Sequence, residues 1–193
     1  MNQKLSKIWV KNFTAKRELP SGFYLHLFDI VRKYISDGIN KKWLDIGCGD
    51  GRILILLAIK YSSLKFFGID INNKMINNLR RGIKHHGIRN IFVKHHSGER
   101  YLNQLKKFDV ISFFQSIHFF KCENILKKAC DKLTHNGCII IATTTHNQFK
   151  SIPYSKSPAI YKVEIKRTPN WIDIVKTLRC NNLKLKSLKT FSV

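Results

Sequence analysis

The chain has 193 residues, of which 44% are hydrophobic and 11% are aromatic. That length is typical of a single domain, and that composition excludes a disordered chain, a collagen and a coiled coil. The longest run of apolar residues, 53–59, is too short to cross a bilayer. We therefore expect a soluble globular protein with no membrane insertion.

The charge balance is strongly basic. Lysine and arginine number 35 against 12 acidic residues, which gives a formal net charge of +23. One interpretation is a polyanionic partner such as RNA. The other is a bias of the coding sequence toward lysine, since 26 of the 35 basic residues are lysines and they are scattered along the chain. Both interpretations stay open from charge alone.

The five cysteines predict neither disulfides nor a zinc site. Their number is odd and no two have the Cys-x-x-Cys spacing. The doublets His85-His86 and His95-His96 lack nearby thiolate or carboxylate ligands at a tetrahedral spacing, so we expect no bound metal. The N-terminus has no apolar segment of a secretory signal. A reducing, cytoplasmic location is the expectation.

The predicted elements alternate between helix and strand. Residues 1–19 form a basic arm and 23–36 a helix, so we treat 1–40 as an N-terminal arm and helix preceding a domain over 41–193. In that domain we expect strands at 43–46, 65–70, 90–94, 108–114 and 138–144, and helices at 51–61, 72–86, 99–106 and 121–134. Asn136-Gly137 is expected to turn the chain. This alternation predicts an α/β fold with a doubly wound, mostly parallel sheet.

The last third of the chain interrupts the alternation. Residues 145–169 contain three of the four prolines and little helical periodicity, which favours a long functional loop, here predicted to be a lid. A helix at 170–180 and a strand at 183–191, where Leu alternates with Lys or Ser, complete the predicted elements.

A glycine-rich turn follows the strand at 43–46. It begins with Asp45 and contains Gly47, Gly49 and Gly51. A dinucleotide fingerprint would require a third glycine at position 52, where this chain has Arg52. A phosphate-binding Walker loop is excluded because no Gly-Lys-Ser/Thr follows. Such a turn lets a ligand approach the backbone and directs the N-terminus of a helix toward it.

This turn resembles the first motif of the class I S-adenosylmethionine-dependent methyltransferases, Asp-x-Gly-x-Gly-x-Gly, and the resemblance extends over 43–144. It implies a Rossmann-like methyltransferase fold and S-adenosyl-L-methionine as the cofactor. It also implies that Asp45 and the backbone at Gly47, Cys48 and Gly49 hold the methionine end of that cofactor.

The same resemblance assigns the residues that follow the second strand. Asp70 ends that strand 23 positions after Gly47 and corresponds to the acid that accepts both ribose hydroxyls in this family. Ile71 would then lie against the adenine. His96 and Ser97 occupy the place of an acidic turn near the adenine amine, so His96 departs from the family pattern.

A fourth motif follows the fourth strand. The stretch 114–119 resembles the Leu-His-His or Leu-His-Trp segment of the family, which places Phe114 and Gln115 beside the cofactor and His118 on the acceptor side, as the candidate catalytic residue. A buried histidine with a structural hydrogen bond is the alternative for His118. The resemblance to the small-molecule branch of the family implies a final pair of strands, whereas this sequence provides one. Either the sheet lacks its last strand or the gene is shortened.

Three functional hypotheses follow. The first is a methyltransferase acting on a small molecule, favoured by the histidine in the fourth motif, by the short lid, and by the lack of the Asn/Asp-Pro-Pro-aromatic motif of amine-methylating nucleic-acid enzymes. The second is an RNA methyltransferase that uses the basic surface. The third is a non-catalytic binding subunit with a methyltransferase fold, which turnover of the cofactor would distinguish from the other two.

Overall fold

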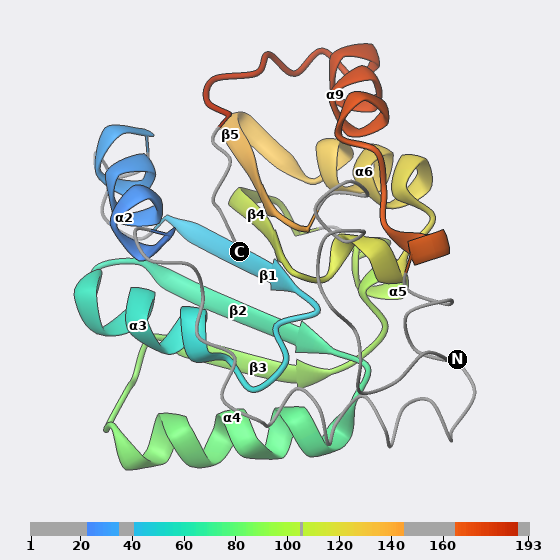
Figure 1. Cartoon of the computed structure of the whole chain (residues 1–193). Helices are drawn as coiled ribbons and strands as arrows, with labels where there is room; N and C mark the ends of the chain where they lie inside the picture. The colour runs from blue at the N-terminus through green and yellow to red at the C-terminus, as the bar shows by residue number, and fades with distance from the viewer. Residues whose placement is uncertain (1–22, 35–40, 105, 145–164, 189–193) are drawn as a thin grey trace.

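The structure, a computed structural model, describes residues 23–34, 41–104, 106–144 and 165–188. Its centre is a sheet of five parallel strands in the order β3-β2-β1-β4-β5 (Figure 1). Their bounds are β1 Lys42–Ile46, β2 Lys65–Asp70, β3 Ile91–His95, β4 Phe108–Phe114 and β5 Leu133–Ala142. The predicted doubly wound parallel sheet is confirmed. The strand order reverses at β1, so a crevice is expected where β1 and β4 end.

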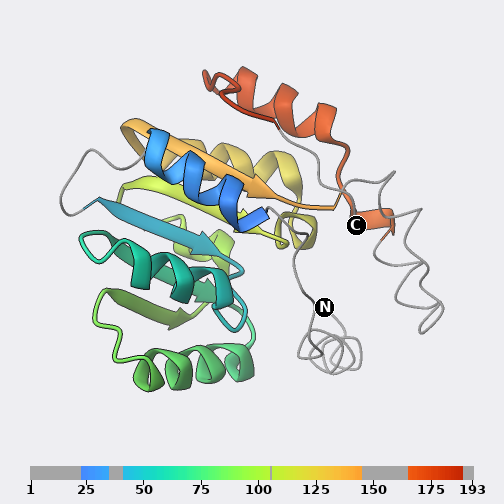
Figure 2. The same cartoon turned by 60° about the vertical axis from the view of Figure 1, so that its left-hand side comes forward.

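Helices cover both faces of the sheet (Figures 1 and 2). One core is shared by the sheet with α2, α3 and α4, and the other by the sheet with α5, α6 and α9. Their bounds are α2 Phe23–Tyr34, α3 Arg52–Lys60, α4 Asn73–His85, α5 Gly98–Tyr101, α6 Cys122–Asp131 and α9 Trp171–Cys180, with a 3-10 turn η1 at Ile117–Phe119. Leu27 and Val31 of α2 are buried in the same core as residues of α3, so α2 packs together with the rest of that core.

Strand β5 differs from its prediction. It begins at Leu133, and the predicted turn at Asn136-Gly137 lies inside it as a bulge. Phe108 pairs with Leu133 and Val110 with Cys138, so one residue of β4 faces four residues of β5. The Thr134 hydroxyl donates a 2.9 Å hydrogen bond to Asp109 Oδ1 across this irregularity. Asn-Gly is a turn signal in isolation, and here cross-strand contacts accommodate it within the strand.

The predicted strand at 183–191 is wrong over 183–188, the part that the structure describes, because these residues pair with no strand. Leu183 packs on the core beside α9, but Leu185 and Leu188 are exposed, so the alternation of Leu with Lys buries no common face. The described residues therefore contain no strand beyond β5. The basic arm, residues 145–164 of the predicted lid and residues 189–193 lie outside the described residues.

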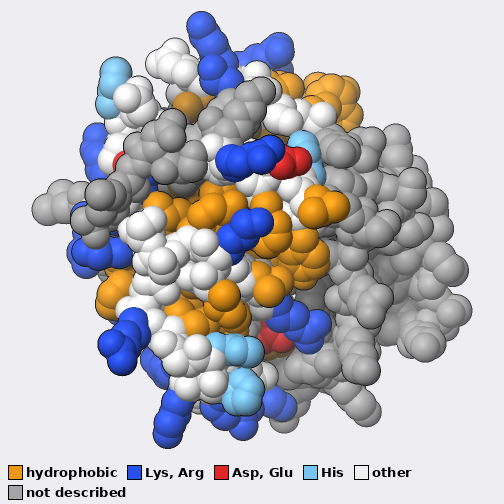
Figure 3. Space-filling view, turned by 90° about the vertical axis from the view of Figure 1, so that its left-hand side faces the viewer, with side chains coloured by type: hydrophobic (Ala, Val, Ile, Leu, Met, Phe, Trp, Pro, Cys, Tyr) orange, Lys and Arg blue, Asp and Glu red, His pale blue; other side chains and the backbone are white. Residues whose placement is uncertain are grey.

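Charged and apolar side chains are mixed on the surface over α2 and α3. Figure 3 shows Lys and Arg side chains spread around this face, with hydrophobic side chains between them. Leu25, Leu56 and Ile59 are among the exposed apolar residues. In the segments that the structure describes, no helix combines the length and the apolar character needed to cross a membrane.

Candidate functional site

The glycine-rich turn connects the end of β1 to the start of α3, and three glycines shape it. Gly47, Gly49 and Gly51 have φ angles of 73°, 57° and 74°, in the left-handed region that favours glycine. A Cβ at Gly47 would lie 2.6 Å from the Cβ of Ser116, and one at Gly51 would lie 2.2 Å from Cδ1 of Leu79. These two glycines therefore permit close packing within the protein.

Gly49 has a different role. A Cβ built there would meet no atom within 4 Å, so the missing side chain leaves open space on the outer side of the turn. The Gly49 N–H donates a 2.9 Å hydrogen bond to Oδ2 of Asp70. At Gly49 the backbone is therefore open to a ligand at the start of α3, and the N-terminus of a helix favours a polar or negatively charged group of such a ligand.

Asp70 lies at the end of β2 and holds two loops together. Its Oδ1 accepts a 2.7 Å hydrogen bond from the N–H of Asn72, and its Oδ2 accepts the bond from Gly49. Burial raises the pKa of Asp70, while the two backbone N–H donors and His95 lower it. A carboxylate has about four acceptor positions, so two remain for the hydroxyls of a ribose diol.

Asp45 is buried at the end of β1, with 2% of its surface exposed. The Ser112 hydroxyl donates a 2.7 Å hydrogen bond to Asp45 Oδ1, and Trp43 Nε1 donates a 2.8 Å hydrogen bond to Ser112 Oγ. Burial raises the pKa of Asp45 to about 7, the hydrogen bond from Ser112 opposes that rise, and the charge of Asp70 adds to it. A cationic ligand beside this carboxyl group would stabilise its ionised form, which burial disfavours.

Two serines of this network were missed by sequence reasoning. Ser112 interrupts the apolar strand β4, and its hydroxyl lies between Trp43 and Asp45. Ser116 donates a 2.5 Å hydrogen bond to the carbonyl oxygen of Ile46, below the glycine turn. Both serines are buried. A small polar residue within an apolar strand was the available signal for Ser112, since a buried hydroxyl requires a partner.

Cys48 turns its thiol away from the open side of the turn. A Cβ at Gly68 of β2 would lie 3.0 Å from Cys48 Sγ, and Cys48 packs against the core under α3. Burial raises the pKa of this thiol well above its ordinary value, so it is protonated at neutral pH. The prediction that the backbone of Cys48 holds a cofactor does not depend on this thiol.

The residues predicted to lie near the adenine follow the ends of β2 and β3. Asp70 and His95 are neighbours in the register, so Ile71 and His96 follow the ends of adjacent strands. The side chain of Ile71 is 67% exposed, and its contact with an adenine stays a prediction. His96 Nδ1 lies 3.0 Å from the carbonyl oxygen of Ser97, the residue that precedes α5.

Phe114 and Gln115 follow one another at the end of β4. The Phe114 ring packs against Trp43 with 6.4 Å between ring centroids, so it belongs to the core. Gln115 has a φ of 53°, an uncommon value for a residue with a side chain, and its Oε1 accepts a 3.3 Å hydrogen bond from the Thr144 hydroxyl. This backbone conformation redirects the chain into η1 and His118.

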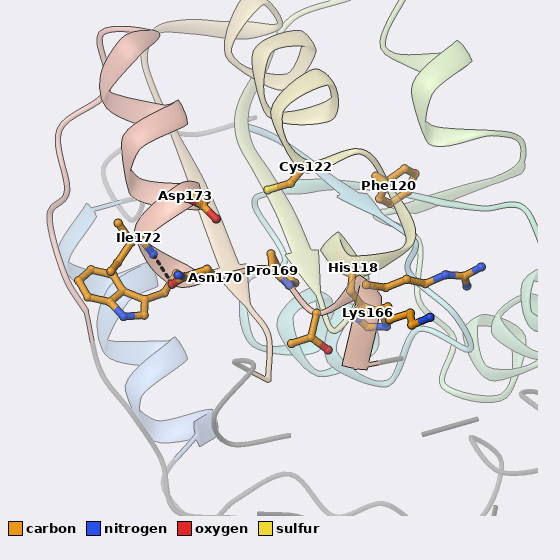
Figure 4. Close-up of a pocket in the computed structure, with 11 residues that line it drawn as sticks. His118, Phe120, Cys122, Lys166, Pro169, Asn170, Ile172 and Asp173 are labelled. Carbon is orange, nitrogen blue, oxygen red and sulfur yellow. Dashed lines mark hydrogen bonds between the residues drawn. The ribbon is translucent and has the colours of Figure 1, made fainter. Parts of the chain in front are cut away.

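His118 lines a cavity of about 730 Å³ between η1 and the start of α9. Figure 4 shows Lys166 next to His118, with Asn170, Ile172 and Asp173 across the cavity. The described residues that line it are His118, Phe120, Cys122, Lys166, Arg167, Thr168, Pro169, Asn170, Trp171, Ile172 and Asp173. The structure thus places His118 at a cavity, and its role on the acceptor side stays a prediction. Residues 166–169 of this wall belong to the predicted lid, whereas residues 170–173 were missed by sequence reasoning about the site.

His118 is a neutral imidazole at pH 7. Burial, and next to it the positive charge of Arg167, lower its pKa to about 4. A neutral imidazole has one ring nitrogen that accepts a hydrogen bond or a proton.

In the described part of the chain, no group of three or more His, Cys, Asp or Glu side chains could hold a metal ion.

A family model described as a methyltransferase domain matches residues 38–180. The chain belongs to this methyltransferase family. The resemblance to the class I enzymes is therefore confirmed, and S-adenosylmethionine is the cofactor of the family.

Curated relatives of the methyltransferase domain include proteins with different acceptors. The carboxy-S-adenosyl-L-methionine synthase of Nautilia profundicola is 29% identical over 114 residues, which cover 59% of this chain and 48% of the relative. A tRNA (guanine-N(7)-)-methyltransferase of Prochlorococcus marinus is 29% identical over 85 residues, which cover 44% and 41%. The chain thus spans about half the length of these relatives or less.

Solved structures share the fold of the methyltransferase domain. The plantazolicin methyltransferase BpumL, solved with a pentazolic desmethylPZN analog and SAH, superposes with a TM-score of 0.72 at 16% identity, over 92% of this chain and 68% of BpumL. The YcgJ protein of Bacillus subtilis superposes with a TM-score of 0.64 at 14% identity, over 83% and 69%. These likenesses confirm the Rossmann-like methyltransferase fold.

The residues of the glycine turn fit S-adenosylmethionine. Gly49 leaves open space for a ligand backbone, and Asp70 retains acceptor positions for a diol. Asp45 is a buried carboxyl group at the same end of the sheet, suited to the ammonium end of the ligand. These features lie at the carboxyl ends of two neighbouring strands, β1 and β2, next to the crevice expected between β1 and β4.

Proposed function

We propose that this chain transfers a methyl group from S-adenosylmethionine to a small molecule that binds in the cavity beside His118. The cavity itself is the observation that carries the proposal, because about 730 Å³ is the size of a small-molecule site. It opens after the end of β4, the strand that flanks β1 and its glycine turn. An acceptor in the cavity would approach the turn from the side of His118.

The chain's main contribution to the reaction is positioning. S-adenosylmethionine, when bound, supplies an electrophilic methyl group. In the displacement, the acceptor atom forms a bond to the methyl carbon while the carbon–sulfur bond breaks and its electron pair stays on sulfur. The glycine turn, Asp45 and Asp70 hold one reactant, and the cavity holds the other, so that the reacting atoms meet in line.

His118 provides for the proton of the acceptor. Where the nucleophile is a hydroxyl or a neutral amine, the proton that it loses passes to the neutral imidazole as the new bond to the methyl carbon forms. With a pKa of about 4, His118 is a weak base and accepts this proton late in the displacement. Asp173 and Cys122 also line the cavity. Burial and the charge of Asp173 raise the pKa of the Cys122 thiol to about 11, so this thiol is protonated at neutral pH and is no base.

RNA is the second candidate acceptor. The relatives include tRNA and ribosomal RNA methyltransferases, and the net charge is +23. Yet on the face over α2 and α3 the basic side chains stand among apolar ones (Figure 3). Binding of RNA through scattered lysines would be weak and indifferent to sequence.

The test is a transfer assay with labelled S-adenosylmethionine. The full chain is incubated with pooled small molecules in one arm and with total transfer and ribosomal RNA in the other, near physiological salt. The proposal expects label in small-molecule products and a loss of that label in His118→Ala, with cofactor affinity unchanged. Label in a defined RNA would establish the second candidate, and binding without turnover in either arm would favour a non-catalytic subunit.

A further inference from the structure

The cavity beside His118 has an uneven distribution of charge. Lys166 stands on the side of His118, and Asp173, on the first turn of α9, stands on the other (Figure 4). Arg167 also lines the cavity, and its charge lowers the pKa of His118. Both basic side chains are exposed, and within the described residues neither forms an ion pair. Two cations and one carboxylate leave the wall near His118 electropositive.

The rest of the lining suits an organic body. Phe120, Pro169, Trp171 and Ile172 contribute apolar surface, and Trp171 and Ile172 are 45% and 54% exposed. An apolar wall with a few charged groups at one end is the usual makeup of a site for a small molecule with one charged substituent.

We infer that the acceptor is a small organic anion whose carboxylate or phosphate group binds beside Lys166 and Arg167, an assignment that rests on the proposed function. Arg167 is the better partner for such a group, because a guanidinium donates two parallel hydrogen bonds to a carboxylate or a phosphate. Asp173 lies across the cavity, where it would repel a second anion and thereby orient the first.

Binding of an anion also changes His118. The charge of Arg167 opposes protonation of the imidazole, and an anion beside Arg167 would offset that charge. His118 then becomes a stronger base only when an anionic acceptor is present. Among the residues that the structure describes, the charged groups of the cavity wall are Lys166, Arg167 and Asp173. Arg167 is in this respect a positioning residue that acts through His118.

The experiment measures binding of three probes to the full chain saturated with S-adenosylhomocysteine, by calorimetry. The probes are 4-hydroxybenzoate, phenyl phosphate and the neutral 4-hydroxybenzamide. We expect at least one anion to bind about tenfold or more tightly than the amide, as charge-assisted hydrogen bonds imply. The anion that binds more tightly distinguishes a carboxylate site from a phosphate site.

The variant Lys166→Gln/Arg167→Gln should abolish this preference. The matched control is Lys176→Gln/Arg179→Gln, which removes the same charge from exposed positions of α9 outside the cavity lining. The control should keep the preference. An equal loss in the control would show attraction by net charge alone and would overturn the inference, as would equal binding of the amide and the anions, or no binding of either anion.

The same variants separate this inference from the proposed function. Where turnover is found, Arg167→Gln should shift the acid limb of the pH–rate profile toward higher pH and leave the affinity for S-adenosylmethionine unchanged. An anion preference with no methyl transfer would contradict the proposed function and keep the anion site. Methyl transfer to neutral acceptors that is unchanged in Lys166→Gln/Arg167→Gln would keep the function and overturn the inference.

Discussion

The backbone N–H of Gly49 donates a 2.9 Å hydrogen bond to Oδ2 of Asp70, joining the turn after β1 to the end of β2. The same carboxylate accepts a 2.7 Å bond from the N–H of Asn72. One side chain therefore sets the position of two loops and still has acceptor positions free for a ligand. Asp70 therefore shapes the proposed cofactor site as well as offering acceptors to it.

Asp70→Ala should weaken S-adenosylmethionine binding by about 1.5–3 kcal/mol, the usual contribution of hydrogen bonds to a charged group. Calorimetry measures the affinity, and the free energy of unfolding is measured beside it because the loops lose an anchor. Asp50→Asn, on the same turn, is the comparison, since the partner of Asp50 is Arg52. An unchanged affinity in Asp70→Ala would contradict the assigned role.

Gly51→Ala should destabilise the fold through a clash with α4. Its Cβ would lie 2.2 Å from Cδ1 of Leu79, and φ is 74°. We expect a loss of about 1–3 kcal/mol, as for overpacked sites, on top of the backbone strain. Gly87→Ala is the matched control, because Gly87 has a φ of 63° and open space around its Cβ. Urea unfolding of both variants isolates the clash, and equal losses would refute it.

His118 should make the fold less stable in acid. Its pKa is lowered from 6.5 to about 4, so the unfolded chain binds more protons between these values, and the free energy of unfolding falls as the pH drops through that window. The group accounts for about 3 kcal/mol at most. Urea titrations at pH 7, 5.5 and 4 should show this fall in the native chain and a smaller one in His118→Gln. Parallel curves would contradict the burial of a neutral imidazole.

Asp45 should have the opposite effect. Its pKa is raised from 3.8 to about 7, so its contribution to stability is complete below pH 3.8 and is lost as the pH rises through about 7. Asp45→Asn, which is neutral at every pH, should remove this loss between pH 5 and 8. Bound S-adenosylmethionine should also reduce it, since the cationic ligand favours the ionised carboxylate. If the free energy of unfolding of the native chain changes between pH 5 and 8 in the same way as that of Asp45→Asn, the assignment is disproved.

The parts of the fold with local signals could be predicted from the sequence. The turn from Gly47 to Gly51 and the apolar strand β4 are encoded by neighbouring residues, so their positions are as expected. The bulge at Asn136-Gly137 depends on how β5 pairs with β4. Whether the segment after α9 forms a strand depends on whether it meets the edge of the sheet, and residues 183–188 do not pair. Neither is a property of the segment alone.

The candidate site divides in the same way. Asp45 and Asp70 stand at strand ends that periodicity locates, and their contacts with a cofactor stay a prediction. The hydroxyl of Ser112 meets Asp45 from 67 positions along the chain, and Arg167 reaches His118 from a segment with no motif. Contacts of that sequence separation follow from strand order and helix packing, which no single stretch of residues specifies.

The central claim is that the turn at Gly49 receives S-adenosylmethionine, and its most direct test is calorimetry of that ligand against two valine variants. Gly49 and Gly87 both have positive φ and open space around a Cβ, so Gly49→Val and Gly87→Val carry the same backbone strain. The account predicts that the native chain and Gly87→Val bind S-adenosylmethionine and its demethylated product, that Gly49→Val binds neither, and that NAD binds to none of the three. Binding of NAD in place of S-adenosylmethionine, or equal affinity in Gly49→Val and Gly87→Val, would contradict it.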